Sequence, residues 1–511
     1  MAIAKQMLDL NDAHDIINED TDLEQVLAYV EGLQSSSMLE NCTLNTIQSL
    51  SSSMNKCLHS KKANGKLNGL VVLQFLVQDC SDEIFNESGS NWIKVILPML
   101  QKIQVSEGAL RLICSILRIL VKKAPQYPDI SRHLTTVVSP MIDALVAVTQ
   151  KFGHLLNECL STICTIFKTY PGSCGSSVSN VENLLLSNIK PDSKLSSDIL
   201  AKCLSLIPRL GGGGKEGMTH KANFVNMFQK LSFTLEDLLS KFFELSFINS
   251  KKSVNFQRTD EPFLLPFPES TDMLKKSLYM QKQFAVVSDC LCALIKVPFP
   301  HYKSIRLGLI LCILKKLFDQ MSLSECGKMV GNEGKVLLLV LPSLMISSLK
   351  ILRELILTCR KSVILIIPGI MDIVLTVLAD LRNFTESFSD LKIQVYKLIS
   401  DICDVVGAND SLEKCHKDLV SYVLSDVLPQ KMPSTSVISQ PNKKKKSTAS
   451  FVPTKTSVCK MNQELIRVAL STLTSILKAM GSIMDESVHK QVQSVLISLG
   501  MEQDCCSIAC I

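Results

Sequence analysis

The sequence predicts an all-α protein, an α-solenoid built from degenerate helical repeats of the HEAT or armadillo kind. Apolar residues recur at helical spacing along most of the 511 residues. Alternating patterns typical of strands are absent, and only 5% of the residues are aromatic. Prolines punctuate the helical runs, with 42 residues from Pro98 to Pro140 and 37 from Pro171 to Pro208. Repeats of two helices have about this length, and their apolar faces are covered only by a neighbouring repeat.

The run Ala109–Lys123 shows the helical pattern most clearly. The basic residues Lys122 and Lys123 suit a helix C-terminus, and Pro125 ends the run. Its apolar stripe at helical spacing consists of Leu110, Ile113, Leu117 and Leu120. The further runs that predict helices of similar design are Trp92–Leu100, Leu155–Tyr170, Leu195–Ile207, Ile305–Phe318, Leu344–Thr358, Leu391–Val406 and Leu465–Met480.

Shifts in composition divide the chain into segments. Gly211–Gly214 predicts a loop, and Lys251–Ser270, with three prolines, predicts an irregular stretch. The predicted segments are an N-terminal helical part (1–60), a helical-repeat domain (61–250), an irregular loop (251–270), a second helical-repeat region (271–430), a disordered Lys/Ser/Thr/Pro linker (431–458), C-terminal helices (459–500) and a tail (501–511).

The charge is concentrated in the linker. Residues 431–460 hold seven of the 54 Lys and Arg and none of the 48 Asp and Glu, so the rest of the chain is nearly neutral. A nearly neutral body does not predict a broad basic face for nucleic-acid phosphates, although it does not exclude a local basic patch. Direct RNA contact is therefore left undecided by the composition.

The 19 cysteines and the apolar runs indicate an intracellular chain without a membrane span. No Cys-x-x-Cys pair occurs, and most Cys lie within apolar helical runs, which favours small buried side chains in a reducing compartment. The N-terminus is too acidic for a secretory signal. The apolar runs Val336–Ile346 and Val363–Met371 each contain a proline and fall short of about 20 residues.

No constellation for catalysis, for a cofactor or for a metal is evident. A phosphate-binding loop ending at Gly214-Lys215 would need Gly where Arg209 stands and Ser or Thr where Glu216 stands. No two of the eight His are four residues apart, so no helical metal pair exists. A Cys–His nucleophile stays open, because such partners meet only in three dimensions. We expect a protein that is not an enzyme.

Leu235, Leu238 and Leu239 form an L-x-x-L-L pattern. On a helix the three side chains share one face, which could dock in the hydrophobic groove of a nuclear receptor. The stripe of a buried core helix has the same spacing, and leucine-rich helices produce it by chance. The core helix is the favoured interpretation, and receptor docking is the alternative.

Lys443, Lys444, Lys445 and Lys446 lie in the acid-free linker. Four consecutive lysines repel one another and cannot pack in a core, so the segment stays extended and solvated. Such a run favours a nuclear localisation signal over a merely solvated linker.

Several segments together resemble the Rix-type pre-ribosomal scaffold family, and within it the animal proline-, glutamate- and leucine-rich members. The resemblance covers roughly residues 60–430 and lies in the order and spacing of short motifs. These motifs are Leu67–Val77, Asn91–Ile93, Asp129–Ser131, Tyr170–Gly175, Cys203–Gly213, Val336–Arg360, Lys392–Tyr396 and Leu424–Pro429. The family's acidic tail, rich in Pro and Glu, is lacking here, and one L-x-x-L-L motif stands where several are usual.

The resemblance implies a helical-repeat scaffold in the nucleolus and nucleoplasm. It implies a role in assembly of the large (60S) ribosomal subunit and in processing of the internal spacer of the rRNA precursor. The partners it implies are a WD-repeat propeller protein, a helical-repeat subunit, pre-60S particles, an AAA-type remodelling ATPase, a SUMO protease and nuclear receptors.

Two other function classes stay open at this stage. A transcription coregulator would use Leu235, Leu238 and Leu239, and it requires these side chains to be exposed. A transport or adaptor solenoid of the importin type would predict no signal function for the lysine run. A scaffold for ribosome assembly that acts through protein contacts is the first hypothesis.

Overall fold

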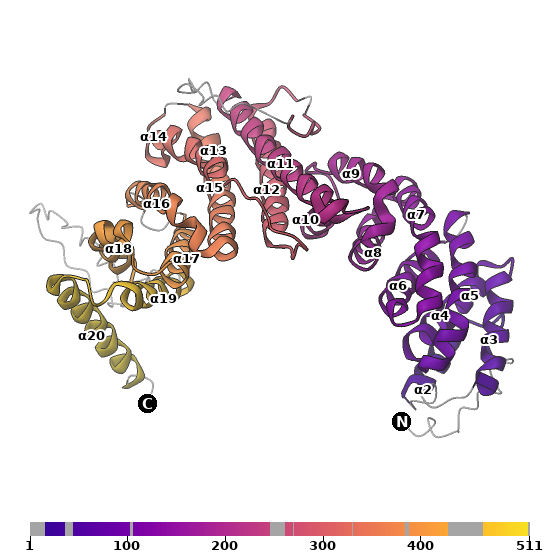
Figure 1. The fold of residues 1–511 in the computed structure, drawn as a ribbon. Helices are drawn as coiled ribbons and strands as arrows, with labels where there is room; N and C mark the ends of the chain where they lie inside the picture. Colours follow the sequence, from indigo (N-terminus) through magenta and orange to yellow (C-terminus); the bar gives the residue numbers. More distant parts are fainter. Residues whose placement is uncertain are drawn as a thin grey trace, which may run out of the picture. The chain divides into compact units, whose positions relative to one another are not determined.

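A computed structural model describes residues 16–35, 44–102, 106–245, 261–268, 270–329, 331–382, 384, 388–427 and 463–508. All regular elements in these ranges are helices, and none of the residues in them lies in a β-strand. The predicted all-α fold is confirmed (Figure 1). The chain divides into unit 1 (Met1–Phe242 and Val254–Ile305) and unit 2 (Phe243–Ser253 and Arg306–Ile511). The segment boundaries expected from composition stay a prediction, and the linker lies outside the described residues.

Unit 1 contains the helices before residue 306. They are α2 (Leu23–Ser35), α3 (Leu44–His59), α4 (Ala63–Asp79), α5 (Asp82–Gln101), α6 (Glu107–Lys123), η2 (Ala124–Gln126), α7 (Pro128–Lys151), η3 (Gly153–Leu155), α8 (Leu156–Thr169), η4 (Pro171–Ser177), α9 (Val178–Ser187), α10 (Ser197–Leu206), η5 (Ile207–Arg209), η6 (Lys215–Gly217), α11 (Met218–Leu245, with its last three residues in unit 2) and α12 (Met273–Lys296).

Unit 2 contains the helices from residue 306 onward. They are α13 (Leu307–Gln320), α14 (Leu323–Lys328), α15 (Asn332–Cys359), η7 (Arg360–Ile366), α16 (Ile367–Leu381), α17 (Ser389–Val405), α18 (Asp410–Val427), α19 (Gln463–Met480) and α20 (Glu486–Ile508).

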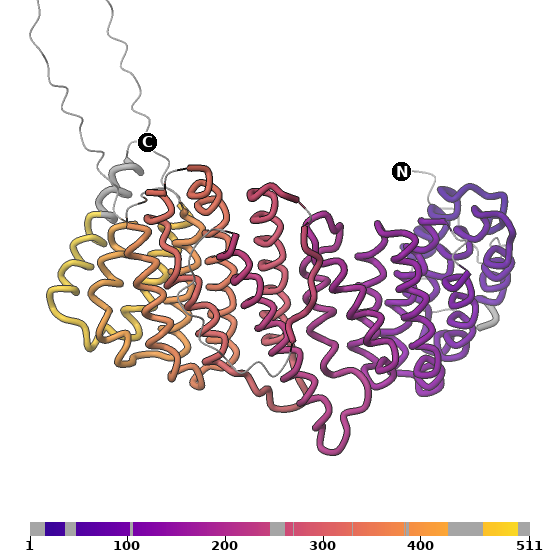
Figure 2. Tube along the Cα trace, turned by 90° about the horizontal axis from the view of Figure 1, so that it is seen from above, coloured from indigo at the N-terminus to yellow at the C-terminus, as the bar shows by residue number. Residues whose placement is uncertain are grey.

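Within each unit most helices pack against the helix two positions further along the chain, so the helices form two rows. In unit 1, α4, α6, α8, α10 and α12 follow one another in one row, and α5 packs on α7 in the other. In unit 2, α15, α17 and α19 form one row, and α16, α18 and α20 form the other (Figure 2). This is the stacking expected of a helical-repeat solenoid.

Helix α6 illustrates how the sequence specifies these elements. The side chain of Ser106 caps its N-terminus by accepting a hydrogen bond from the amide of Ala109, at 3.4 Å. Glu107 in the first turn and Lys122 and Lys123 in the last complement the helix dipole. The predicted stripe, Leu110 to Leu120, is at most 1% exposed.

Polar side chains tie neighbouring helices together beside the apolar core. Arg111 of α6 donates to Glu158 of α8 at 2.8 Å, and Arg353 of α15 donates to Asp401 of α17 at 2.6 Å. Thr472 of α19 donates to the backbone carbonyl of Tyr396 in α17 at 3.0 Å. These directional contacts fix the register between helices that apolar burial alone would leave free to slide.

The prolines that punctuate the predicted helical runs do not all mark helix ends. Pro171 and Pro208 lie at the starts of η4 and η5, but Pro98 and Pro140 lie inside α5 and α7. Proline removes one backbone donor, and flanking packing of a buried helix can offset that loss. The proline spacing was therefore a weaker guide to the repeat than the apolar stripes.

The stretch Asn332–Leu381, which spans α15, η7 and α16, is long and apolar enough to cross a membrane, and its most apolar 18-residue window has a mean hydropathy of 2.4. The apolar runs Val336–Ile346 and Val363–Met371, each too short when counted alone, both lie within this stretch. Half of the most apolar window is buried within the structure. The core helices of a stacked repeat pass the same test, so the property is weak support for a membrane span.

Candidate interaction surface

The leucines of the L-x-x-L-L pattern lie in the core of unit 1. Leu235, Leu238 and Leu239 belong to α11 and are 0%, 4% and 2% exposed. Glu236, between them, is also buried. A groove-binding helix must present these side chains to solvent. Their burial fits the core-helix interpretation and does not favour the coregulator.

The lysine run from Lys443 to Lys446 lies outside the described residues. Its role as a nuclear localisation signal stays a prediction.

Two of the buried thiols, Cys174 and Cys403, are poorly suited to nucleophilic chemistry. Burial raises the pKa of Cys174 to about 12, and burial together with Asp404 raises that of Cys403 to about 12. A thiol with such a pKa is protonated at neutral pH and is a weak nucleophile. Among the described residues no group of three or more His, Cys, Asp and Glu could hold a metal ion.

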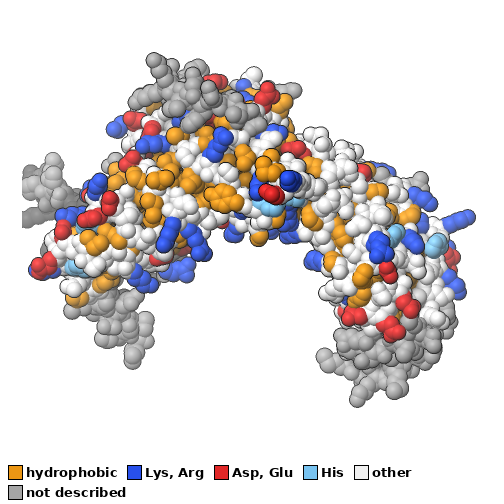
Figure 3. Space-filling model, viewed as in Figure 1, with side chains coloured by type: hydrophobic (Ala, Val, Ile, Leu, Met, Phe, Trp, Pro, Cys, Tyr) orange, Lys and Arg blue, Asp and Glu red, His pale blue; other side chains and the backbone are white. Residues whose placement is uncertain are grey.

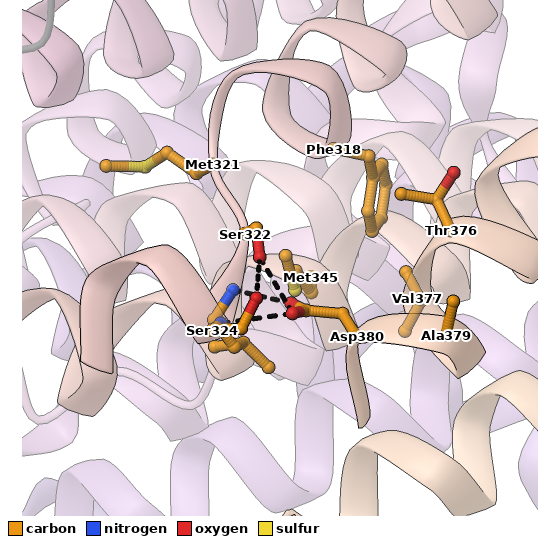
Figure 4. A pocket seen from close by; sticks show the side chains of 10 residues that line it. Phe318, Met321, Ser322, Ser324, Met345, Thr376, Val377, Ala379 and Asp380 are labelled. Carbon is orange, nitrogen blue, oxygen red and sulfur yellow. Dashed lines mark hydrogen bonds between the residues drawn. The ribbon is translucent and has the colours of Figure 1, made fainter. Parts of the chain in front are cut away.

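A cavity of about 300 Å³ in unit 2 is organised around Asp380 of α16 (Figure 4). Its carboxylate accepts hydrogen bonds from the Ser322 hydroxyl at 2.7 Å and from the amides of Leu323 and Ser324 at 2.5 and 3.0 Å. These amides begin α14, so the carboxylate acts as the N-terminal cap of a neighbouring helix. The remaining lining is mostly apolar, with Phe318 and Met345 among it. The arrangement is structural.

The η7 tip, defined as Leu357, Arg360, Lys361, Ile364 and Leu365, is an exposed apolar feature of unit 2. Leu365 is 89% exposed and Ile364 is 51% exposed. Arg360 and Lys361 are exposed beside them, and Arg360 has a positive φ of 47°. No acidic residue occurs between Leu357 and Leu365. An exposed apolar pair that is bordered by cations is typical of a protein-docking surface.

Two buried side chains hold the η7 tip in place. Val363 is fully buried and Ile366 is 8% exposed, so the short 3-10 helix is anchored on both sides of its exposed pair. Figure 3 shows one face of the molecule, where hydrophobic side chains gather over α15 and its neighbours. The anchored tip therefore presents Ile364 and Leu365 without the entropy cost of ordering a free loop.

Sequence reasoning missed this surface. Val363–Met371 was considered only as a possible membrane span, and alternation between buried and exposed residues in a 3-10 helix has no clear signature in sequence. The adjacent Arg360-Lys361 pair was the available signal.

Comparison with known proteins gives a consistent result. Residues 13–196 match the RIX1 family model, described as rRNA processing/ribosome biogenesis. The chain is 24% identical over 472 residues to proline-, glutamic acid- and leucine-rich protein 1 of Xenopus laevis, covering 88% of this chain and 45% of the frog protein. It is 24% identical over 385 residues to the Mus musculus protein of the same name, covering 73% of this chain and 33% of the mouse protein.

The fold is also similar to a solved structure. A chain from a structure described as "Rix1-Rea1 pre-60S particle - Rix1-subcomplex" aligns with 96% of this chain and 88% of its own length, at a TM-score of 0.66 and 13% identity. At that identity the likeness shows the fold, and the chain spans less than half of the curated relatives it matches. The resemblance to the Rix-type family is confirmed, and residues 13–196 are the part of this chain that carries the RIX1 family region.

Proposed function

We propose that this chain is a non-enzymatic scaffold in assembly of the large ribosomal subunit and in processing of the internal spacer of the rRNA precursor. The observation that carries the proposal is the match of residues 13–196 to a family described as rRNA processing/ribosome biogenesis. The fold shared with a chain of a Rix1 subcomplex supports it.

The description of the similar structure supports the first two of the proposed partners, and the family resemblance of the sequence implies the others. The proposed partners are pre-60S particles, an AAA-type remodelling ATPase of the Rea1 kind, a WD-repeat propeller protein, a second helical-repeat subunit and a SUMO protease. The proposed site of action is the nucleus, in the nucleolus and nucleoplasm. The lysine run from Lys443 to Lys446 would serve entry into that compartment.

The mechanism of such a scaffold is binding by shape. Stacked helices offer an extended surface, and inter-helix contacts such as Arg353 with Asp401 keep that surface rigid. The η7 tip fits a protein partner with an apolar pocket and an acidic rim, since Arg360 and Lys361 border its exposed pair.

The transcription coregulator is the weaker candidate. It rests on the names of relatives whose greater part lies beyond the aligned region. Its docking motif would have to leave the core of α11 before any receptor could bind it.

The test is affinity purification of the tagged chain from nuclear extract, with mass spectrometry of the bound proteins and RNA. We expect recovery of large-subunit precursors, a WD-repeat protein and a second helical-repeat protein. Recovery of receptors or chromatin factors without pre-ribosomal material would overturn the proposal.

A pair of variants tests the η7 tip in the same experiment. Replacing both Ile364 and Leu365 by Ser removes the apolar pair, and we expect at least one protein partner to be lost. Leu339→Ser is the matched control, because Leu339 is 59% exposed but lies on α15, outside the tip. Equal recovery with both variants would exclude the tip as a docking point.

A further inference from the structure

The segment that follows α12 in unit 1 points alternate side chains into and out of the structure. The ring of Phe299 lies 5.1 Å from that of Phe224 in α11, and the ring of His301 lies 6.0 Å from that of His220. Tyr302, between two anchored neighbours, is 85% exposed.

Lys303 is the second anchor beside Tyr302. Its ammonium lies 6.0 Å from the centre of the Phe224 ring and donates a hydrogen bond to the carbonyl of Ile295. Both neighbours of Tyr302 are held against the helices, so the backbone at Tyr302 is anchored. Its side chain extends into solvent from that anchored position.

The glycine loop before α11 is fitted to the two histidines. Gly217 has a φ of +72°, and a Cβ there would lie 1.9 Å from Nε2 of His301. His220 Nε2 lies 3.2 Å from the carbonyl oxygen of Gly211, and its ring packs against Gly213. Only glycine at position 217 allows the imidazole of His301 to lie this close to the backbone.

The surroundings of Tyr302 are basic. Residues 209–224 and 295–303 together contain one acidic residue, Glu216. In Figure 3 histidine side chains over α11 and α12 lie beside both an acidic and a basic side chain. The five lysines and arginines of these two segments are Arg209, Lys215, Lys221, Lys296 and Lys303.

We propose that Tyr302 is the stacking platform of a binding site for single-stranded RNA. The exposed ring offers its face to a base, and Lys215 and Lys221, from the segment whose Gly217 and His220 contact His301, would pair with the flanking phosphates. Stacking is tolerant of sequence, because every base has an aromatic face. The site adds direct RNA contact to the scaffold role.

The experiment measures binding of 5′-fluorescein-labelled decauridine to the purified full chain by fluorescence anisotropy. We expect Tyr302→Ala to weaken binding about 5- to 150-fold, the contribution of one stacked base, and Tyr302→Phe to bind within about twofold of the parent chain. Tyr302 is largely exposed, so neither change disturbs the core. Phe267→Ala is the matched control, because Phe267 is 48% exposed in the same unit but lies outside the cluster.

Two further measurements separate this site from the lysine-rich linker. Replacing both Lys215 and Lys221 by Gln should reduce the slope of log affinity against log salt by about 1.4, at about 0.7 for each phosphate contact on a single strand. Photocrosslinking of decauridine that carries one 4-thiouridine should modify the peptide containing Tyr302.

Unchanged affinity in Tyr302→Ala, or crosslinks confined to residues 431–460, would overturn the proposal. Trapping of a protein but no RNA by a photoreactive residue at position 302 in nuclear extract would overturn it in favour of a protein contact. The anisotropy assay contains only the chain and the RNA, so its failure leaves the scaffold proposal standing.

Discussion

Nζ of Lys392 lies 2.7 Å from Oδ1 of Asp426, and the two side chains are only 8% and 9% exposed. The phenol of Tyr396 donates to Oδ2 of the same carboxylate at 2.6 Å. The three residues join α17 to α18 in the middle of unit 2. Two charges withdrawn from water in this way stabilise the fold only while both are present.

Removing one member of this pair should therefore destabilise unit 2 more than removing both. We expect Lys392→Met to cost about 3–5 kcal/mol, because it leaves the Asp426 carboxylate buried without its cation. The double variant Lys392→Met with Asp426→Leu should recover most of that loss. Urea unfolding followed by circular dichroism provides the comparison, and a double variant as unstable as the sum of the singles would contradict it.

Gly217 and Gly212 offer a matched pair of substitutions in one loop. Gly217→Ala should displace His301 and strain a backbone with φ of +72°. We expect it to destabilise the fold by more than about 1 kcal/mol, because alanine stabilises only where the native backbone conformation suits it. Gly212→Ala should change stability by less than about 0.5 kcal/mol, since no atom lies within 4 Å of its Cβ position. Thermal unfolding of both variants checks the difference, and equal melting temperatures would count against the described loop.

Leu238 should behave as a core residue. Leu238→Ala is expected to cost about 2–5 kcal/mol through lost burial and the cavity left behind. Met218→Ala on the same helix is the control, because Met218 is 61% exposed, and it should change stability little. A stable Leu238→Ala variant that loses binding to a nuclear-receptor domain would instead restore the coregulator hypothesis.

Asp485 should titrate below its ordinary value. The hydrogen bond from Lys417 and then its charge lower the pKa of Asp485 from the usual 3.8. The pKa of Asp485 is lower in the folded chain than in the unfolded chain. The contact between Lys417 and Asp485 therefore stabilises the fold above about pH 3.8, and this stabilisation is lost as pH falls through the folded pKa. Carboxyl-detected NMR titration should show this pKa returning toward 3.8 in Lys417→Met. No change in that variant would exclude the ion pair in solution.

Thiol labelling should distinguish buried from exposed cysteines. We expect iodoacetamide at pH 7.5 to modify Cys312, which is exposed, in the native chain. Cys174 and Cys403, with pKa raised to about 12, should react only after unfolding. Peptide mapping by mass spectrometry gives the order, and rapid native labelling of Cys174 would mean that η4 opens readily.

Helix positions were largely predictable, because they depend on local periodicity. The run Ala109–Lys123 corresponds to α6 within two residues, and Leu465–Met480 corresponds to α19. Pro98 and Pro140 lie inside helices and mark no helix end, since a single proline can be accommodated inside a long buried helix. The Rix-type resemblance was also readable from sequence, because it depends on the order of motifs along the chain.

The sequence by itself determined the all-α class, the apolar stripes and the family region, since these follow from residue spacing along one dimension. Only the tertiary structure decided which apolar residues are covered. Leu238 and Leu365 are equally hydrophobic, yet one is 4% and the other 89% exposed. Exposure depends on which helix packs above a side chain, and that neighbour is distant in sequence. For the same reason Tyr302 emerged as a candidate binding residue only after His301 and Lys303 were seen to be anchored on α11 and α12.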